Sequence, residues 1–362
     1  MAQQAHRVTL AEVAAAAQVS TMTVSRVLND QPGVAPETRA RVARVIAESG
    51  FVRNRAARAL KRRHTGVVDL VVPKLDSAHI LEIMRGVEDT LAPTPFRLAV
   101  SATHCEERGE RQWLAKVADG GTDGAILVLA RGQSAQLDEL RRRRIPFVVV
   151  DHRGELAADT PSVGATNWSG AHQATDYLLS LGHRRIAFIG GPLSFGCSRE
   201  RQSGYRAALD AAQVPADPAL ILPGDFHQEA GYAAARALLA LPAPPTALFA
   251  GNDMQALGVY AALRERGLSA PDDMSVVGFD DIPFAALAGP PLTTVRQPLA
   301  EMGRVAAGML LTLIDGAPLA SPRVELATAL IVRASCAALG APVQVSPRAV
   351  TVGGLCERCT SL

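Results

Sequence analysis

Residues 9–29 read TLAEVAAAAQVSTMTVSRVLN, and their pattern predicts two short helices joined by a tight turn. Thr9 is a typical N-cap residue, and Glu12 three positions later can complete a capping box. Ser20 can cap the second helix, whose apolar residues recur at helical spacing from Val24 onward. Two such helices separated by a turn of about three to four residues are typical of a helix-turn-helix.

A third helix is expected after this pair, starting at Pro36 and ending before Gly50. Proline suits the first turn of a helix, and glycine commonly ends one. This helix would add Val42 and Ile46 to the small apolar core of the first two helices. Residues 1–53 are therefore expected to form a small all-α domain.

Charge is concentrated at the N-terminal end of the chain. Residues 1–63 contain eleven Lys and Arg against four Asp and Glu, a net charge of +7, which leaves −5 for the rest of a chain whose total is +2. A basic segment on an acidic body indicates that the segment binds a polyanion. Arg26, on the polar side of the second helix, can donate two bonds to a guanine in the major groove, although a solvated helix face would carry the same residues.

The composition fits a chain of two or three domains without a membrane segment. The 362 residues (38.1 kDa) are 48% hydrophobic and 20% charged, and they contain no uncharged apolar run of about 18 residues. The five cysteines are scattered and odd in number, which does not indicate a disulfide framework. We therefore expect no membrane association and a reducing, cytoplasmic location.

The stretch at residues 9–29 resembles the DNA-binding head of the lactose-repressor (LacI/GalR) family of bacterial transcription regulators. The resemblance implies that double-stranded DNA is a partner. The residues of the head that are expected to contact DNA are Thr9, Ser20, Thr21, Met22, Thr23, Ser25, Arg26 and Asn29. Gln18 and Ala35 depart from the family, which usually has a turn glycine and a serine cap there, and either change is expected to cost head stability.

Residues 54–65 connect the head to the body and are rich in alanine and arginine. A helix of this length is marginal alone in water, so its order should depend on a partner. The resemblance implies a hinge helix that folds on DNA beside its dimer mate, with Leu60 wedged into the minor groove and Arg55 and Ala57 in contact with DNA. A basic flexible linker is the alternative.

From Thr65 onward, apolar runs alternate with amphipathic helical patterns, which is typical of an α/β protein with parallel sheets covered on both faces. Candidate strands include GVVDLVV (66–72), RIAFIG (185–190) and ALILPG (219–224). Their number fits two doubly wound lobes, with a break near residues 162–167 and later segments that could cross back. Ligands bind beyond the carboxyl ends of the strands in such sheets, so two facing lobes would form a cleft.

The resemblance extends to about Ala337 and implies a body of the periplasmic-binding-protein type, with three crossovers and a sugar or similar small metabolite in the cleft. The positions that match the family's ligand contacts are Asp76, Arg201, Phe226, Asn252, Asp253 and Asp280. These side chains suit a carbohydrate, because carboxylates accept from hydroxyl pairs, an arginine fork donates two bonds, and an aromatic ring covers the apolar face of a pyranose.

Each of these positions also has a structural interpretation. Asp280 could cap a turn, Phe226 could belong to the core, and Arg201 could pair with Glu200 or Glu229. Their shared placement at predicted strand ends favours the cleft.

Features that would indicate an enzyme or a cofactor are weak in this sequence. No Ser/His/Asp or paired-carboxylate arrangement stands out as catalytic, and we expect no cofactor. Cys356 and Cys359 form a C-x-x-C motif, but a second pair of ligands is missing nearby, so residues 338–362 are expected to be a disordered tail rather than a metal site.

The sequence therefore predicts a sugar-responsive transcriptional repressor that binds a palindromic operator as a homodimer, with residues 66–337 as the two-lobed effector-binding and dimerisation domain. The sequence does not decide whether the effector weakens DNA binding or, as a co-repressor, tightens it. The stretch VRQPLAEMG (295–303) is similar to actinobacterial-type regulators of plant-polysaccharide use, which favours xyloside or glucoside oligomers. A solute-binding protein for sugar uptake is the alternative, and it would need export and no DNA-binding head.

Overall fold

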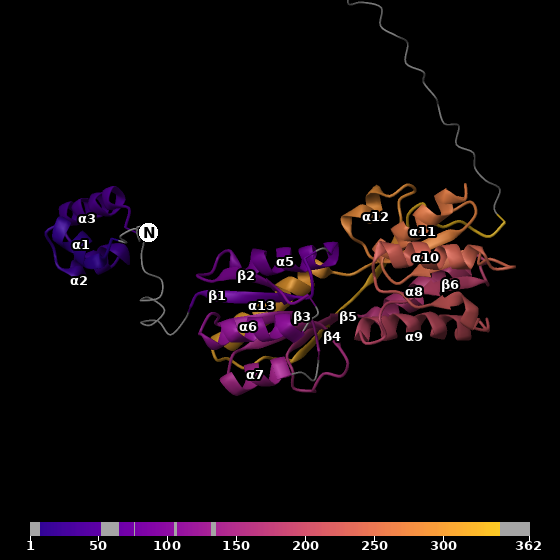
Figure 1. Ribbon diagram of the computed structural model, residues 1–362, viewed down its shortest axis with the longest axis horizontal. Helices are drawn as coiled ribbons and strands as arrows, with labels where there is room; N and C mark the ends of the chain where they lie inside the picture. The colour runs from indigo at the N-terminus through magenta and orange to yellow at the C-terminus, as the bar shows by residue number, and fades with distance from the viewer. Residues whose placement is uncertain (1–7, 52–64, 76, 105–106, 132–134, 341–362) are drawn as a thin grey trace, which may run out of the picture. The chain divides into compact units, whose positions relative to one another are not determined.

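A computed structural model describes residues 8–51, 65–75, 77–104, 107–131 and 135–340 (Figure 1). The chain divides into two compact units, Met1–Gly66 and Val67–Leu362. Below they are called the head and the body, and each is described by itself.

The head consists of three helices, α1 (Leu10–Ala16), α2 (Thr21–Leu28) and α3 (Pro36–Ser49), around one apolar core. The predicted capping box is confirmed, because the backbone N–H of Glu12 donates to Thr9 Oγ1 and the Glu12 carboxylate accepts from the Thr9 N–H at 2.7 Å. The core is made of Val13, Ala14, Ala17, Val24 and Val42. The helix-turn-helix expected from residues 9–29 is therefore present.

Gln18 and Ala35, which depart from the family pattern, occupy positions where the backbone favours another residue type. Gln18, in the turn between α1 and α2, has φ of 51°, a left-handed conformation that favours glycine. Ala35 precedes α3 and offers no side-chain bond to the free N–H groups of that helix. Arg41 does support the turn, since its Nε donates to the carbonyl of Ala17 at 3.0 Å.

The first lobe of the body is a sheet of six parallel strands in the order β11-β5-β4-β3-β1-β2. One face packs on α5 (Ala78–Leu91) and α13 (Leu299–Ile314), and the other packs on α6 (Glu107–Ala118) and α7 (Ala135–Arg143). The strands are β1 (Val67–Val72), β2 (Arg97–Ala102), β3 (Gly124–Arg131), β4 (Phe147–Arg153), β5 (Ser162–Ala165) and β11 (Arg323–Leu326).

The second lobe has a six-stranded sheet in the order β12-β10-β9-β8-β6-β7, in which β12 alone runs antiparallel to its neighbour. The strands are β6 (Ile186–Ile189), β7 (Ile221–Leu222), β8 (Ala247–Ala250), β9 (Ser275–Asp280), β10 (Thr293–Arg296) and β12 (Ala329–Ile331). The helices that cover it are α8 (Asn167–Ser180) and α9 (Gly196–Ala211) on one face, and α10 (Gln228–Leu239), α11 (Asp253–Glu265) and α12 (Pro283–Leu287) on the other.

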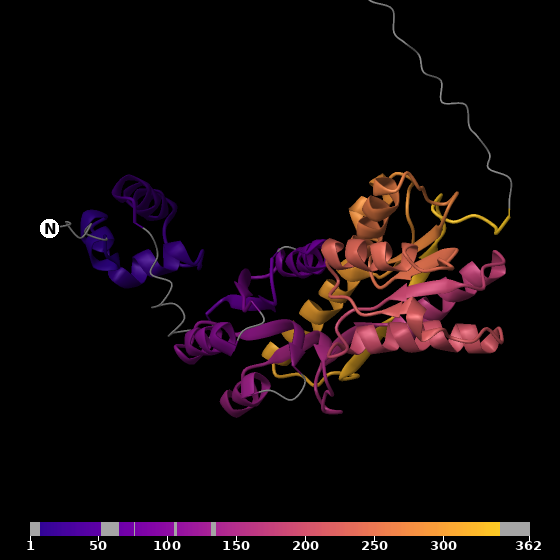
Figure 2. The same ribbon diagram turned by 45° about the vertical axis from the view of Figure 1, so that its right-hand side comes forward.

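Within the described ranges the chain crosses between the lobes three times, as expected (Figures 1 and 2). The first crossing joins β5 to α8, the second joins β10 to α13, and the third joins β11 to β12. One predicted strand is largely wrong. In ALILPG, residues Pro218–Leu220 form a 3-10 helix and only Ile221 and Leu222 pair with β6, since prolines lie on both sides of these residues.

No helix in the described part of the chain combines the length and the apolar character needed to cross a bilayer.

Candidate ligand-binding site

A cavity of about 200 Å³ lies where the carboxyl ends of the two sheets face each other. Its lining residues come from segments that follow strands of both lobes, as expected for doubly wound sheets. Lys74 and His79 follow β1, and Asn252 follows β8. Asp151 lies near the carboxyl end of β4, and Asp280 is the last residue of β9.

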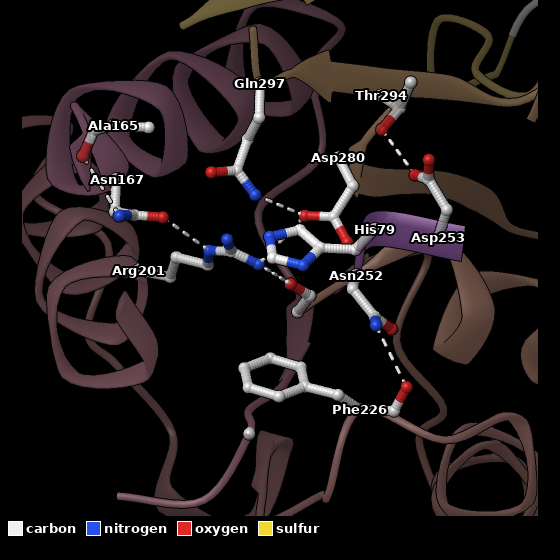
Figure 3. Close-up of polar contacts among 12 residues, drawn as sticks. His79, Ala165, Asn167, Arg201, Phe226, Asn252, Asp253, Asp280, Thr294 and Gln297 are labelled. Atoms are coloured by element: carbon white, nitrogen blue, oxygen red, sulfur yellow. Dashed lines mark hydrogen bonds and ion pairs between the residues drawn. The ribbon is translucent and has the colours of Figure 1, made fainter. Parts of the chain in front are cut away.

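Arg201 lies at the centre of the site and is held from several sides (Figure 3). Helix α9 places it next to the sheet edge, where Nε donates to Asn167 Oδ1 at 2.9 Å and Nη1 donates to the carbonyl of Gly251 at 2.6 Å. Its guanidinium carbon lies 3.7 Å from the centre of the Phe279 ring, which is a cation–π contact. The guanidinium is therefore fixed before any ligand arrives.

Asp280 is the ion-pair partner of Arg201, rather than Glu200 or Glu229, with 3.5 Å between Arg201 Nη1 and Asp280 Oδ1. The same oxygen accepts from Gln297 Nε2 at 2.6 Å. The carboxylate lines the cavity, so it is available to hydroxyl groups of a ligand as well.

Phe226 and Asn252 lie side by side on the second lobe. Asn252 caps α11, with Oδ1 accepting from the N–H of Gln255 and Nδ2 donating to the carbonyl of Phe226 at 2.9 Å. The Phe226 ring is half-buried, faces the guanidinium of Arg201 at 5.7 Å, and lies 6.0 Å from the ring of Phe195. The two rings supply an apolar surface beside a charged group, which matches the two kinds of surface on a sugar.

Asp253 differs from its expected position, because it lies behind the cleft and does not line it. Oδ2 accepts from the N–H of Ile282 at 2.9 Å, and Oδ1 accepts from Thr294 Oγ1 at 2.5 Å. Burial, followed by the nearby negative charge of Asp280, raises the pKa of Asp253 well above its usual value. Asp253 therefore ties the start of α11 to the segment after β9 and to β10, and it does not face a ligand in the cavity.

Asp151 and His79 line the cavity from the first lobe, and sequence reasoning missed both. Asp151 lies near the carboxyl end of β4, two residues before the last one, and is buried, and its Oδ2 lies 3.8 Å from His79 Nε2 at the start of α5. Burial raises the pKa of Asp151, while Coulombic interactions with His79 and with the Arg201 guanidinium lower it. A polar residue directly after the apolar run FVVV (147–150) was the signal that could have identified Asp151.

Cys197 also lines the cleft, one helical turn before Arg201 on α9. Burial raises the pKa of its thiol to about 12, so the thiolate is absent at neutral pH and the residue contributes shape rather than reactivity.

Four of the expected contact residues lie outside the described ranges: Arg55, Ala57, Leu60 and Asp76.

The exposed side of α2 carries the predicted DNA contacts of the head. Thr21, Met22 and Arg26 are exposed, and Met22 has 64% of its surface accessible. The remaining expected contacts have local bonds. Ser20 accepts from the N–H of Thr23, and Asn29 donates to the carbonyl of Ser25.

A helix-turn-helix head and a two-lobed body with a polar and aromatic cleft, joined in one chain, define a ligand-responsive DNA-binding regulator. Residues 9–54 match the family described as bacterial regulatory proteins, lacI family, and residues 175–336 match the periplasmic binding protein-like domain. The ribose operon repressor of Halalkalibacterium halodurans is 32% identical over 325 residues, which cover 90% of this chain and 96% of that protein. The chain belongs to the lacI family of bacterial regulatory proteins.

Two solved structures resemble most of the chain. A complex of the transcriptional regulator CelR with cellobiose is 35% identical to this chain and has a TM-score of 0.71. The match covers 91% of this chain and 100% of the CelR chain. A lac repressor dimer bound to operator and the anti-inducer ONPF is 28% identical and has a TM-score of 0.82. The match covers 92% of this chain and 100% of the lac repressor chain.

Proposed function

We propose that this protein is a sugar-responsive transcriptional repressor whose operator affinity changes when a small carbohydrate binds between the lobes. One observation carries the proposal. The chain that holds a helix-turn-helix also holds a cleft in which a fixed arginine, carboxylates and two phenyl rings converge. Members of this family are transcriptional regulators rather than enzymes, so the cleft binds the effector and does not catalyse a reaction.

The chemistry of the cleft supports a neutral polyol ring as ligand. Asp280 and Asp151 offer acceptors from opposite lobes, and Asn252 and Arg201 are fixed by their own bonds, so little ordering remains to be paid for on binding. Phe226 and Phe195 provide apolar contact for a ring face. The similarity to the CelR–cellobiose complex supports glucoside or xyloside oligomers as the first compounds to test.

The DNA-binding side of the proposal assigns three segments. Residues 1–53 bind the major groove through the N-terminal half of α2, residues 54–65 form the hinge that contacts the minor groove, and residues 66–337 sense the ligand and dimerise, which leaves 338–362 as a tail. A homodimer on a palindromic operator follows from two-fold symmetry, and the lac repressor dimer on its operator is the nearest precedent among the structures described above. Binding to chromosomal DNA places the protein in the cytoplasm.

Effector and operator sites lie in different units, so their influence on each other is allosteric and reciprocal. If a sugar changes operator affinity by some factor, the operator changes sugar affinity by the same factor. A sugar that weakens operator binding is an inducer, and one that strengthens it is a co-repressor.

A thermal-shift screen followed by operator titration tests the proposal. The purified full-length protein is melted with ribose, glucose, xylose, cellobiose and xylobiose, and a sugar at 100 times its Kd should add about 2.7 kcal/mol to the stability of the body. Fluorescence anisotropy with operator DNA, with and without the stabilising sugar and across a salt series, then measures coupling. A chain beginning at Gly66 that bound operator as tightly as the full chain would refute the assignment of the head.

The rival function, a solute-binding protein for sugar uptake, predicts a different result. Such a protein would bind sugar with the same affinity in the presence and absence of operator DNA, because nothing would link the two sites. Turnover of the sugar in the absence of any other reactant would indicate an enzyme instead.

A further inference from the structure

Two amide side chains behind the cleft connect its ligand-facing groups to the segments that cross between the lobes. Asn167 is the first residue of α8, directly after the first crossing, and Gln297 follows β10 in the second crossing. Both side chains are buried, and neither lines the cavity. Each can therefore act on a ligand through the group that it holds, and not by touching the ligand itself.

Asn167 holds Arg201 with one end of its amide and the crossing backbone with the other. Its Oδ1 accepts from Arg201 Nε at 2.9 Å, and its Nδ2 donates to the carbonyl of Ala165, the last residue of β5, at 3.0 Å. Figure 3 shows this chain of contacts from Ala165 to the guanidinium. Arg201 is a residue of the second lobe, whereas Ala165 belongs to the sheet of the first lobe.

Gln297 holds Asp280 in a comparable way from the second crossing. Its Nε2 donates to Asp280 Oδ1 at 2.6 Å, and its backbone N–H donates to the Asp280 carbonyl at 3.2 Å. The other end of this amide, Oε1, is buried and has no hydrogen-bond partner among the described residues. Gln297 therefore contacts Asp280 through both its side chain and its backbone, so a movement of the second crossing changes the position of Nε2 relative to Asp280 Oδ1.

The contacts form one continuous path. It leads from the first crossing through Asn167, Arg201, Asp280 and Gln297 to the second crossing, and its middle step is the 3.5 Å ion pair of the two ligand-facing groups. The third crossing is fastened to the first, because the N–H of Thr328 donates to Thr166 Oγ1 at 3.0 Å and the two hydroxyls lie 3.0 Å apart. The ligand-facing pair is thus bonded to the segments on which any relative rotation of the lobes must turn.

We propose that Asn167 and Gln297 are positioning residues that transmit sugar binding from Arg201 and Asp280 to the crossing segments. The inference rests on the proposed function, since it assumes that a sugar engages this pair and that the lobes respond. A bound sugar shifts the Arg201 guanidinium or the Asp280 carboxylate, and the hydrogen bonds of these groups carry the shift to Asn167 and Gln297. The crossing segments then move, because the packed lobes move as units.

The test measures coupling, the ratio of operator affinities without and with saturating sugar, in the full-length protein. The probe is the compound among ribose, glucose, xylose, cellobiose and xylobiose that raises the melting temperature of the native protein most. Sugar Kd is measured by calorimetry for every variant so that saturation is ensured. Asn167→Ala and Gln297→Ala are each expected to reduce the coupling ratio by about twofold to thirtyfold.

Asn167→Asp separates holding the arginine from transmitting the signal. A carboxylate still accepts from Arg201 Nε, but it cannot donate to the Ala165 carbonyl or to the neighbouring Glu200 carboxylate, and it repels both instead. We therefore expect sugar affinity within about threefold of native with a reduced coupling ratio. A ligand contact alone, or a merely structural role, would not separate the two readouts in this way.

Tyr205→Phe is the matched control. It removes one buried hydrogen bond of the second lobe, from the Tyr205 hydroxyl to the Ile186 carbonyl at 2.8 Å, and neither of these two residues belongs to a crossing segment. It should lower the melting temperature without changing the coupling ratio. Native coupling in all three Asn167 and Gln297 variants, or a loss of coupling in Tyr205→Phe equal to theirs, would overturn the inference. A native protein that binds a sugar without any change in operator affinity would overturn the proposed function instead.

Discussion

Replacing Arg201 by alanine should damage both the stability and the ligand response of the body. The guanidinium is buried and makes hydrogen bonds to Asn167 and Gly251, an ion pair with Asp280 and a ring contact with Phe279. Truncation leaves the Asp280 carboxylate buried and without its cation, and breaking a buried pair in this way costs about 3–5 kcal/mol.

Urea unfolding of the body, followed by tryptophan fluorescence, gives the change in unfolding free energy, and calorimetric titration with the stabilising sugar gives the loss of affinity. Arg206→Ala is the control, because Arg206 is an exposed arginine on the same helix and its removal should change stability by less than about 0.5 kcal/mol. Arg201→Lys should bind sugar almost as poorly as Arg201→Ala, since an ammonium group cannot reproduce the planar fork. Equal stabilities of the Arg201→Ala and Arg206→Ala proteins, or sugar affinity retained in both, would refute the reasoning.

Further substitutions test the head, the hinge and the first lobe. Gln18→Gly should stabilise the head by about 0.5–1 kcal/mol. Glycine removes the left-handed strain at φ 51°, and the greater conformational entropy of the unfolded chain with glycine offsets part of that stabilisation. Thermal unfolding of the head measures the change, and a lower melting temperature would contradict it. Ala35→Ser should add about 1 kcal/mol by capping α3, and an unchanged melting temperature would show that the cap is not formed. Leu60→Ala should weaken binding to operator DNA more than binding to random DNA, and an equal loss on both would argue against a minor-groove wedge. Asp151→Asn should weaken sugar binding and yet stabilise the body at pH 7.5, but not near pH 4. Burial raises the folded-state pKa of Asp151, so the native protein loses stability relative to the variant as the pH rises above the unfolded pKa of about 3.9. A difference in the free energy of urea unfolding that does not depend on pH would exclude this explanation.

The sequence patterns that act locally predicted the structure well. The capping box of Thr9 and Glu12, the turn at Gln18 and the helix starting at Pro36 depend on neighbours within a few residues, and all three are present. Asp280 ends β9, as the carboxyl-end rule for parallel sheets predicts, whereas Arg201 lies in the second turn of α9 and not at a strand end, so its pairing with Asp280 was not predictable from strand direction.

Side-chain direction was harder to predict, as two adjacent residues show. Asn252 and Asp253 both follow β8, but the cap geometry of α11 turns Asn252 toward the cleft and Asp253 toward Thr294 on β10. The outcome depends on the packing of α11 against β9 and β10, which no short-range pattern encodes. The pairing of His79 with Asp151 joins residues more than seventy positions apart, so it required the fold itself.

Backbone conformation gives an independent reason to regard the cleft as the functional part of the body. Asp151, Phe226 and Asp280 all line the cavity and all have positive φ, at 49°, 70° and 113°. A non-glycine residue in such a conformation costs of the order of 1–3 kcal/mol, and glycine would remove that cost at each position. A sequence under selection for stability alone would be expected to place glycine there, as the chain does at Gly50 at the end of α3. Two carboxylates and a phenyl ring at strained positions of one cavity are consistent with the ligand role that we propose for them, and the packed cores of the two lobes offset the stability that these positions cost.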